Sequence, residues 1–224
     1  MKRDKSIMEP GNKGKRYPPE PLTPDEVRTL LSAITGKGPL ASRNRALVAL
    51  LWRSGLRVSE ALALYPRDVD GSAGTVNVRE GKGRKARVAV IDSEALAYLR
   101  AWMELRRRLG INGRHPIFCS VADGAKGKGQ RKAGRALDTS YVRRLLPKLA
   151  DRAGIEKRVH AHGLRHSHAT ELVDAGVPLH VITGQLGHAS TATTDTYLMK
   201  LKPAERIASM RAAGWALDEP QERR

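Results

Sequence analysis

The chain has 224 residues, and 41 Lys or Arg against 23 Asp or Glu give it a formal net charge of +18. This length predicts one or two domains with a real core, and 40% apolar residues argue against wholesale disorder. The single cysteine, Cys119, excludes an intramolecular disulfide or a Cys-rich zinc module, and the longest apolar run, residues 46–52, is too short to span a membrane.

The strong positive charge indicates a polyanionic partner, with nucleic acid as the first expectation and an anionic membrane surface as the second. Nine aromatic residues are too few for a single-strand binder built on stacking platforms. The charged N-terminus has no apolar segment after it, so we expect no signal peptide and a cytoplasmic protein.

Residues 1–20 predict a flexible basic tail, either solvated or in contact with DNA. The segment Thr23-Pro-Asp-Glu26 is a capping box that begins the first helix. Two β-leaning runs flank a hairpin turn at residues 81–84. The expected fold is mainly α with a small antiparallel β-sheet (α+β). The two strands are expected over 75–78 and 86–91. A second helix is expected over 42–54 with Gly55 as its C-cap, and another helix begins at Asp92 or Ser93. Further helices are expected over residues 58–64, 140–153, 164–175, 179–186, 193–199 and 203–213.

The stretch 120–137 is rich in Gly and in basic residues, has no periodicity and predicts a basic loop. Its charges, with Arg84 of the hairpin, either contact DNA phosphates or form a solvated face. The DNA-contacting candidates are Lys126, Lys128, Arg131, Lys132 and Arg84. We expect one ordered domain over 21–214, between the tail 1–20 and a polar tail 215–224.

Six of the seven histidines lie between His160 and His188, which raises the question of a metal site. The spacing does not fit a metalloprotease helix, no Cys is near, and the only nearby carboxylates are Glu171 and Asp174. We therefore expect no metal site. Most of these histidines, His160, His166, His168 and His180, are expected to pack, cap or meet DNA backbone.

Five short motifs occur in a fixed order along the chain. They are residues 54–64 (Ser-Gly-Leu-Arg-Val-Ser-Glu-Ala-Leu-Ala-Leu), Gly81-Lys-Gly83, residues 162–170 (His-Gly-Leu-Arg-His-Ser-His-Ala-Thr), Leu186-Gly-His-Ala-Ser190 and Thr194-Asp-Thr-Tyr197. Each is weak alone. On the five motifs together, the chain resembles the tyrosine recombinase (phage integrase) family over about residues 22–199. It resembles the catalytic domain, without the core-binding domain that usually precedes it.

The resemblance implies a site-specific DNA strand transferase that cuts and rejoins DNA through a 3′-phosphotyrosyl link, without metal or nucleotide cofactor. Tyr197 would be the nucleophile, and Arg57 and Arg165 would bind the phosphate oxygens. His162 would accept or donate a proton, His188 would hydrogen-bond the phosphate, and Lys82 would protonate the leaving oxygen. Glu60 is expected to orient or cap its neighbours.

The implied partners are double-stranded DNA and either a homo-tetramer on two sites or a full-length recombinase, with no membrane. The C-terminal region, about 200–224, would dock on a neighbour or pack on its own domain. Relaxation of DNA without recombination would use the same chemistry. Three competing interpretations are an inactive truncated remnant, a nucleoid or RNA-binding structural protein, and a non-catalytic DNA-binding regulator that uses residues 177–187 in a helix-turn-helix.

Overall fold

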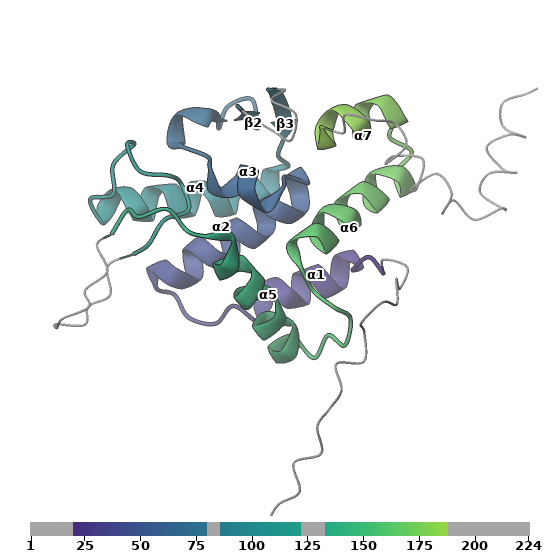
Figure 1. The fold of residues 1–224 in the computed structure, drawn as a ribbon, viewed down its shortest axis with the longest axis horizontal. Coiled ribbons are helices and arrows are strands. Elements are labelled where there is room, and N and C mark those ends of the chain that lie inside the picture. Colours follow the sequence, from purple (N-terminus) through teal and green to yellow (C-terminus); the bar gives the residue numbers. More distant parts are fainter. Residues whose placement is uncertain (1–19, 80–85, 122–132, 188–224) are drawn as a thin grey trace, which may run out of the picture.

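The computed structural model describes residues 20–79, 86–121 and 133–187, which form a helical body with one small sheet beside it (Figure 1). The expected fold class, mainly α with a small antiparallel sheet, is confirmed. The elements in chain order are α1 (Pro24–Ser32), α2 (Pro39–Ser54), α3 (Val58–Leu62), a 3-10 turn (Pro66–Asp68), β1 (Val69–Asp70), β2 (Thr75–Val78), β3 (Arg87–Val90), α4 (Ser93–Arg108), α5 (Thr139–Ala153), α6 (Ala161–Asp174) and α7 (Leu179–Leu186).

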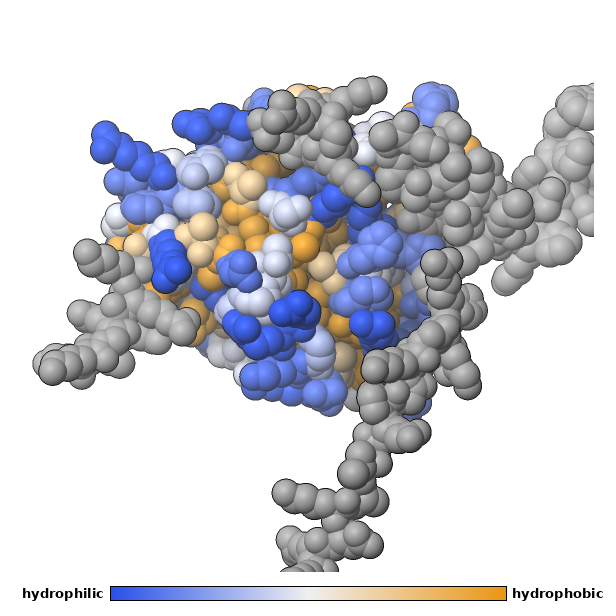
Figure 2. Space-filling model, viewed as in Figure 1, coloured by the Kyte–Doolittle hydropathy of each residue, from blue (hydrophilic) through white to orange (hydrophobic). Residues whose placement is uncertain are grey.

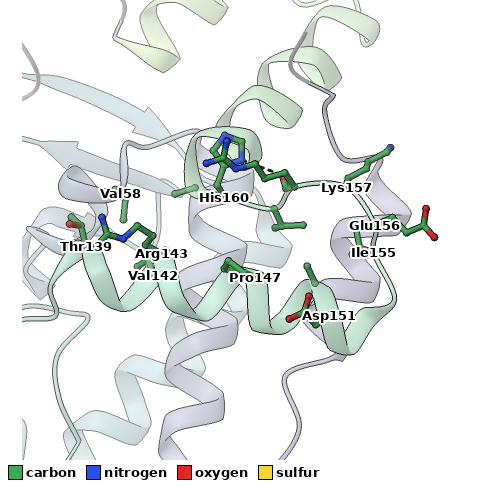
Figure 3. Close-up of a pocket in the computed structure, with 14 residues that line it drawn as sticks. Val58, Thr139, Val142, Arg143, Pro147, Asp151, Ile155, Glu156, Lys157 and His160 are labelled. Carbon is green, nitrogen blue, oxygen red and sulfur yellow. Dashed lines mark hydrogen bonds between the residues drawn. The ribbon is translucent and has the colours of Figure 1, made fainter. Parts of the chain in front are cut away.

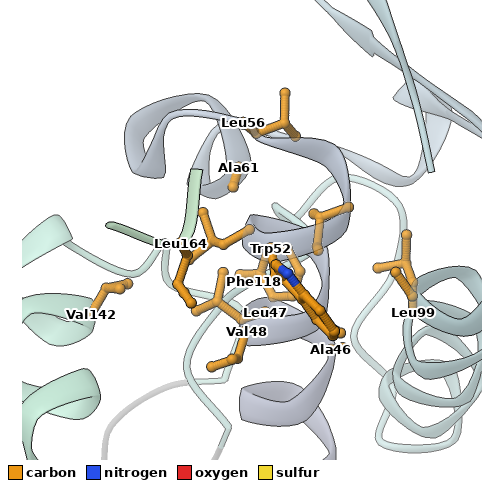
Figure 4. Close-up of a cluster of buried hydrophobic side chains, with 14 of the residues drawn as sticks. Ala46, Leu47, Val48, Trp52, Leu56, Ala61, Leu99, Phe118, Val142 and Leu164 are labelled. Carbon is orange, nitrogen blue, oxygen red and sulfur yellow. The ribbon is translucent and has the colours of Figure 1, made fainter. Parts of the chain in front are cut away.

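Helix α2 is the centre of the core and packs against both α4 and α6. Every residue from Ala46 to Trp52 is buried, because the longest apolar run of the sequence lies where helices cover it on several sides. Trp52, Leu99 and Trp102 are also buried in this core. Figure 4 shows Trp52 and Leu164 in this cluster, which joins α2 to α6.

Local signals set the helix ends. Thr23 and Glu26 form the expected capping box, with the Glu26 amide donating to Thr23 Oγ1 (3.2 Å) and the Thr23 amide donating to Glu26 Oε2 (2.7 Å). Asp92 caps α4 by accepting from the Ala95 amide (2.8 Å). Helix α2 begins at Pro39, earlier than the expected residue 42, because Pro at the first helical position needs no amide donor.

The sheet has the order β1-β2-β3, and both pairings are antiparallel. The pairing of β2 with β3 runs from Thr75 opposite Val90 to Val78 opposite Arg87, which confirms the two expected strands. Strand β1 was not predicted, since two residues carry no periodicity. The turn at 81–84 lies outside the described residues.

Several other expectations also fall outside the described residues. They are the tail 1–20 except for Glu20, the helices over 193–199 and 203–213, the tail 215–224 and the middle of the loop 120–137. The two ends of that loop are described, and a bridge between Cys119 and Ala136 holds them side by side.

Candidate active site

The His-x-x-Arg motif lies at the start of α6. This helix begins before the expected Leu164, so that His162 and Arg165 lie about one turn apart on the same face. The buried Arg165 guanidinium donates from Nη1 to the Gly55 carbonyl (2.6 Å) and from Nη2 to the Leu186 carbonyl (2.7 Å). Arg165 therefore joins the start of α6 to the ends of α2 and α7.

Arg57 lies just after the end of α2, at the N-cap of α3. The turn before it needs Gly55, whose φ is +61° and where a Cβ would lie 2.6 Å from the Leu186 side chain. Arg57 donates from Nη1 to Glu60 Oε1 (2.8 Å), and its Nη2 lies 3.4 Å from the Gly187 carbonyl oxygen. Both arginines of the motifs thus reach the end of α7.

Glu60 is a buried carboxylate that acts as expected, as a cap and an orienting group. Its Oε2 accepts from the Arg57 amide (2.8 Å) and from Arg87 Nη2 (2.8 Å), and its Oε1 accepts from Arg87 Nη1 (3.0 Å). Burial acts to raise the pKa of Glu60, but the hydrogen bonds from Arg87 and Arg57 outweigh it and lower this pKa to about 2. Glu60 is therefore a fixed negative charge at neutral pH.

His162 lies on the exposed side of the first turn of α6. Partial desolvation lowers the pKa of His162, and the positive charges of Arg165, His160 and Arg57 lower it further. The ring is thereby kept neutral near pH 7, in a form that can accept a proton.

A cavity of about 450 Å³ lies between α5 and the segment that leads into α6 (Figure 3). Val142, Pro147 and Ile155 give it an apolar wall, and His160 lies at its rim with Nδ1 3.2 Å from the Arg158 carbonyl oxygen. The His160 and His162 ring centroids are 6.4 Å apart, so this cavity adjoins the start of α6.

The basic face of α5 was not predicted from the sequence. Arg143, Arg144, Lys148 and Arg152 are exposed on this helix, while Val142 and Leu146 are buried beneath it. Figure 2 shows hydrophilic residues gathered over α5. The signal was present in the amphipathic pattern of residues 141–152, whose polar positions are mostly Lys and Arg.

Of the six residues with expected catalytic roles, the described part of the chain contains Arg57, His162 and Arg165. The other three, Lys82, His188 and Tyr197, lie outside it, as do Lys126, Lys128, Arg131, Lys132 and Arg84. In the sequence, Lys82 belongs to the connection between β2 and β3, and His188 directly follows Gly187.

The four histidines expected to pack, cap or meet DNA backbone divide into two pairs. His166 and His168 are buried, as expected for packing, and His160 and His180 are exposed. Within the described ranges, no three His, Cys, Asp or Glu side chains gather as ligands of one metal ion would. No helix in this part of the chain has the length and apolar character needed to cross a bilayer.

The sequence matches the model of the phage integrase family over residues 20–203. Tyrosine recombinase XerC of Halalkalibacterium halodurans is 38% identical over 187 residues, which cover 83% of this chain and 59% of the relative. The crystal structure of XerA recombinase is similar with a TM-score of 0.71 at 30% identity, covering 91% of this chain and 68% of that chain.

A second solved structure is the post-cleavage complex of the XerH site-specific recombinase bound to palindromic difH substrate, with a TM-score of 0.67 at 28% identity. The similarity covers 87% of this chain and 54% of XerH. The chain spans about three fifths of the length of the curated relatives it matches. The family match extends from before Arg57 to beyond Tyr197, and the chain therefore belongs to the phage integrase family.

Proposed function

We propose that the protein is a site-specific DNA strand transferase that cuts and rejoins double-stranded DNA through a 3′-phosphotyrosyl intermediate. The convergence of Arg57 and Arg165 on the end of α7, with His162 one turn from Arg165, is the observation that supports it most. Two planar, permanently charged guanidinium groups suit the non-bridging oxygens of a phosphodiester. The similar recombinase XerH is bound to its DNA substrate in a post-cleavage complex.

In the proposed cleavage step, the Tyr197 hydroxyl oxygen attacks the scissile phosphorus. The P–O bond to the 5′ oxygen breaks while the new P–O bond to Tyr197 forms. A neutral His162 takes the phenol proton, and Lys82 gives a proton to the leaving 5′ oxygen. Arg57, Arg165 and His188 stabilise the negative charge on the non-bridging oxygens in the transition state.

Rejoining is the reverse reaction with a second 5′-hydroxyl, so that the bond energy is stored in the phosphotyrosine. The number of bonds to phosphorus is the same before and after each step, and no electron is transferred. The scheme therefore calls for no metal ion or nucleotide cofactor.

The proposed DNA-binding surface includes the basic face of α5. Its side chains Arg143, Arg144, Lys148 and Arg152 are exposed on the helix that forms one wall of the cavity beside His160. Lysine and arginine contacts to phosphates give affinity that falls steeply with salt through counterion release. Lys126, Lys128, Arg131, Lys132 and Arg84 would extend this surface.

We also propose that the protein acts as a homo-tetramer on two DNA sites, or together with a full-length recombinase. An open cavity of about 470 Å³ beside α6 and α7, with Val90, Leu172 and Val181 in its wall, offers an apolar surface for a neighbouring subunit. Light scattering of the protein with a paired-site DNA tests this, and a single subunit per site at every concentration would contradict it.

The chemistry is tested with a nicked suicide DNA substrate, which lets the cleaved 5′ end diffuse away and traps the adduct. Wild type and a Tyr98→Phe control should form a protein–DNA band on a denaturing gel. Tyr197→Phe should bind the same DNA in a native gel but form no adduct. An adduct with Tyr197→Phe would contradict the assignment of the nucleophile. Binding without any wild-type adduct would favour either a regulator or a subunit that needs a full-length recombinase.

The role of His162 has its own test in the pH dependence of single-turnover cleavage. Because its pKa is lowered from the usual 6.5, the base is neutral at pH 7 and is lost only as the pH falls through that lowered value. We expect the acid side of the rate profile to have its midpoint below 6.5, the usual value for histidine. A midpoint at or above 6.5 would contradict a histidine base with a lowered pKa.

A further inference from the structure

The geometry points to Arg87 as a positioning residue that fixes Arg57 and leaves its positive charge available to the scissile phosphate. This inference rests on the proposed function. Arg87 is the first residue of β3 and lies five residues after Lys82 in the sequence. Its side chain is one-tenth exposed.

Arg87 and Arg57 share one buried carboxylate. Glu60 is 2% exposed at its side chain, and each of its two oxygens accepts one bond from Arg57 and one from Arg87. The bidentate pair with Arg87 holds Glu60 in one rotamer and leaves it a single guanidinium bond to Arg57. The Arg57 guanidinium is thereby oriented by its Nη1, and its side chain stays 28% exposed.

The charges of this group explain why two arginines are needed. Two guanidinium charges and one carboxylate charge sum to +1, so Arg57 faces the site with an uncompensated positive charge. Without Arg87, the buried Glu60 would have Arg57 as its remaining guanidinium partner, and the sum would be zero. A neutral ion pair attracts a phosphate much less than a free guanidinium does.

Arg87 also sets where α7 ends relative to β3. Its Nε donates to the Gln185 carbonyl (3.2 Å), and a Cβ on Gly187 would lie 2.7 Å from the Arg87 side chain. Gln185 in turn accepts from the Val90 amide and donates to the Val90 carbonyl, both at 2.8 Å. The carbonyl oxygen that Arg57 Nη2 approaches, that of Gly187, is therefore held in place against Arg87.

The test compares Arg87→Met, Arg87→Lys and the double variant Arg87→Met with Glu60→Gln. Arg79→Met is the matched control, because it removes the arginine partner of Asp68, a carboxylate that is likewise 2% exposed and lies just before β1. Single-turnover cleavage is measured on a phosphodiester and on a methylphosphonate, in which a methyl group replaces one charged non-bridging oxygen. Thermal unfolding of each variant shows which proteins are folded.

We expect Arg87→Met to slow phosphodiester cleavage between about 10- and 100-fold, with DNA affinity within about 3-fold of wild type. Arg87→Lys keeps the positive charge and should lose less of the cleavage rate than Arg87→Met does. The double variant restores the net charge of +1 and should recover part of the rate, and the defect of Arg87→Met should shrink on the methylphosphonate. Arg79→Met should cleave as wild type does.

A double variant slower than Arg87→Met, or an equal defect on both substrates, would overturn the positioning role and leave Arg87 a packing residue. Orthovanadate binding, followed by vanadium NMR, separates this outcome from failure of the proposed function, because it requires no cleavage. Weaker vanadate binding in Arg87→Met that recovers in the double variant supports the role even if wild type forms no adduct, and unchanged binding counts against it.

Discussion

The core around α2 and the junction where α2, α6 and α7 meet are held together by different forces. In the core, Leu47, Leu50 and Trp52 are buried against apolar neighbours from α4 and α6. At the junction, Arg165 and Arg57 bind carbonyl oxygens and a carboxylate at helix ends. Apolar contacts are non-directional and give stability, whereas charge-assisted hydrogen bonds fix direction. Substitutions in the two regions should therefore affect different measurements.

The largest expected effect is on the rate, from Arg165→Lys at the junction. Lysine cannot bind the two carbonyls and the proposed phosphate with one planar group, so cleavage should slow about 1,000-fold, which is about 4 kcal/mol in the transition state. Single-turnover assays on the suicide substrate measure this. A near wild-type rate would mean that the junction is structural only.

The next effect is on stability, from Leu50→Ala in the core. Leu50 is fully buried in α2, so removing its side chain leaves a cavity and should cost about 3 kcal/mol of unfolding free energy. Urea unfolding followed by circular dichroism measures it. The folded fraction should cleave at the wild-type rate. Slower cleavage by the folded fraction would show that the core also affects the rate.

A comparable effect should appear with pH at His168, which lies between the two regions. Burial, then the charge of Arg53, lowers the pKa of this ring to about 4, against 6.5 in an unfolded chain. Between pH 6.5 and pH 4, His168 therefore binds a proton in the unfolded chain but not in the folded chain. Stability should therefore fall by up to about 3 kcal/mol as the pH drops from 6.5 to 4.

His168→Gln removes this proton uptake and should flatten the pH dependence of urea unfolding. Glu171 acts in the opposite direction, because burial raises its pKa and it binds a proton more readily when folded. Glu171 therefore makes the unfolding free energy of the wild type depend less steeply on pH. Equal slopes in wild type and His168→Gln would show that the buried ring is not what senses acid.

The smallest expected effect lies far from the junction, at the capping box of α1. Thr23→Ala leaves the Glu26 amide without its acceptor and should cost about 1 kcal/mol of unfolding free energy. Cleavage by the folded protein should be unchanged. A slowed rate in this variant would show that α1 is coupled to the junction.

The sequence predicted what depends on near neighbours in the chain. The capping box of Thr23 and the left-handed Gly55 are local devices, and the motif residues Arg57 and Arg165 were identified by their order. What it did not predict depends on tertiary contacts. The buried Arg43, for instance, donates to the Cys119 carbonyl and to Tyr141, and this needs a loop and a helix 76 and 98 residues away.

The role of Arg87 shows the same limit at the candidate site. In the sequence it is one of several basic residues near Lys82, and only the fold brings its guanidinium onto Glu60 and the end of α7. The sequence predicts that α6 begins at Leu164, three residues after its actual start at Ala161. The reason is that the first turn is polar and lacks the apolar periodicity that marks a helix.

DNA cleavage by a tyrosine nucleophile is tested by locating the covalent link between protein and DNA. The adduct trapped on a suicide substrate is digested with protease and nuclease, and the modified peptide is sequenced by mass spectrometry. We expect a nucleotide joined through its 3′-phosphate to Tyr197. A link to any other residue, or DNA bound with no covalent link even when a full-length recombinase is added, would contradict this assignment.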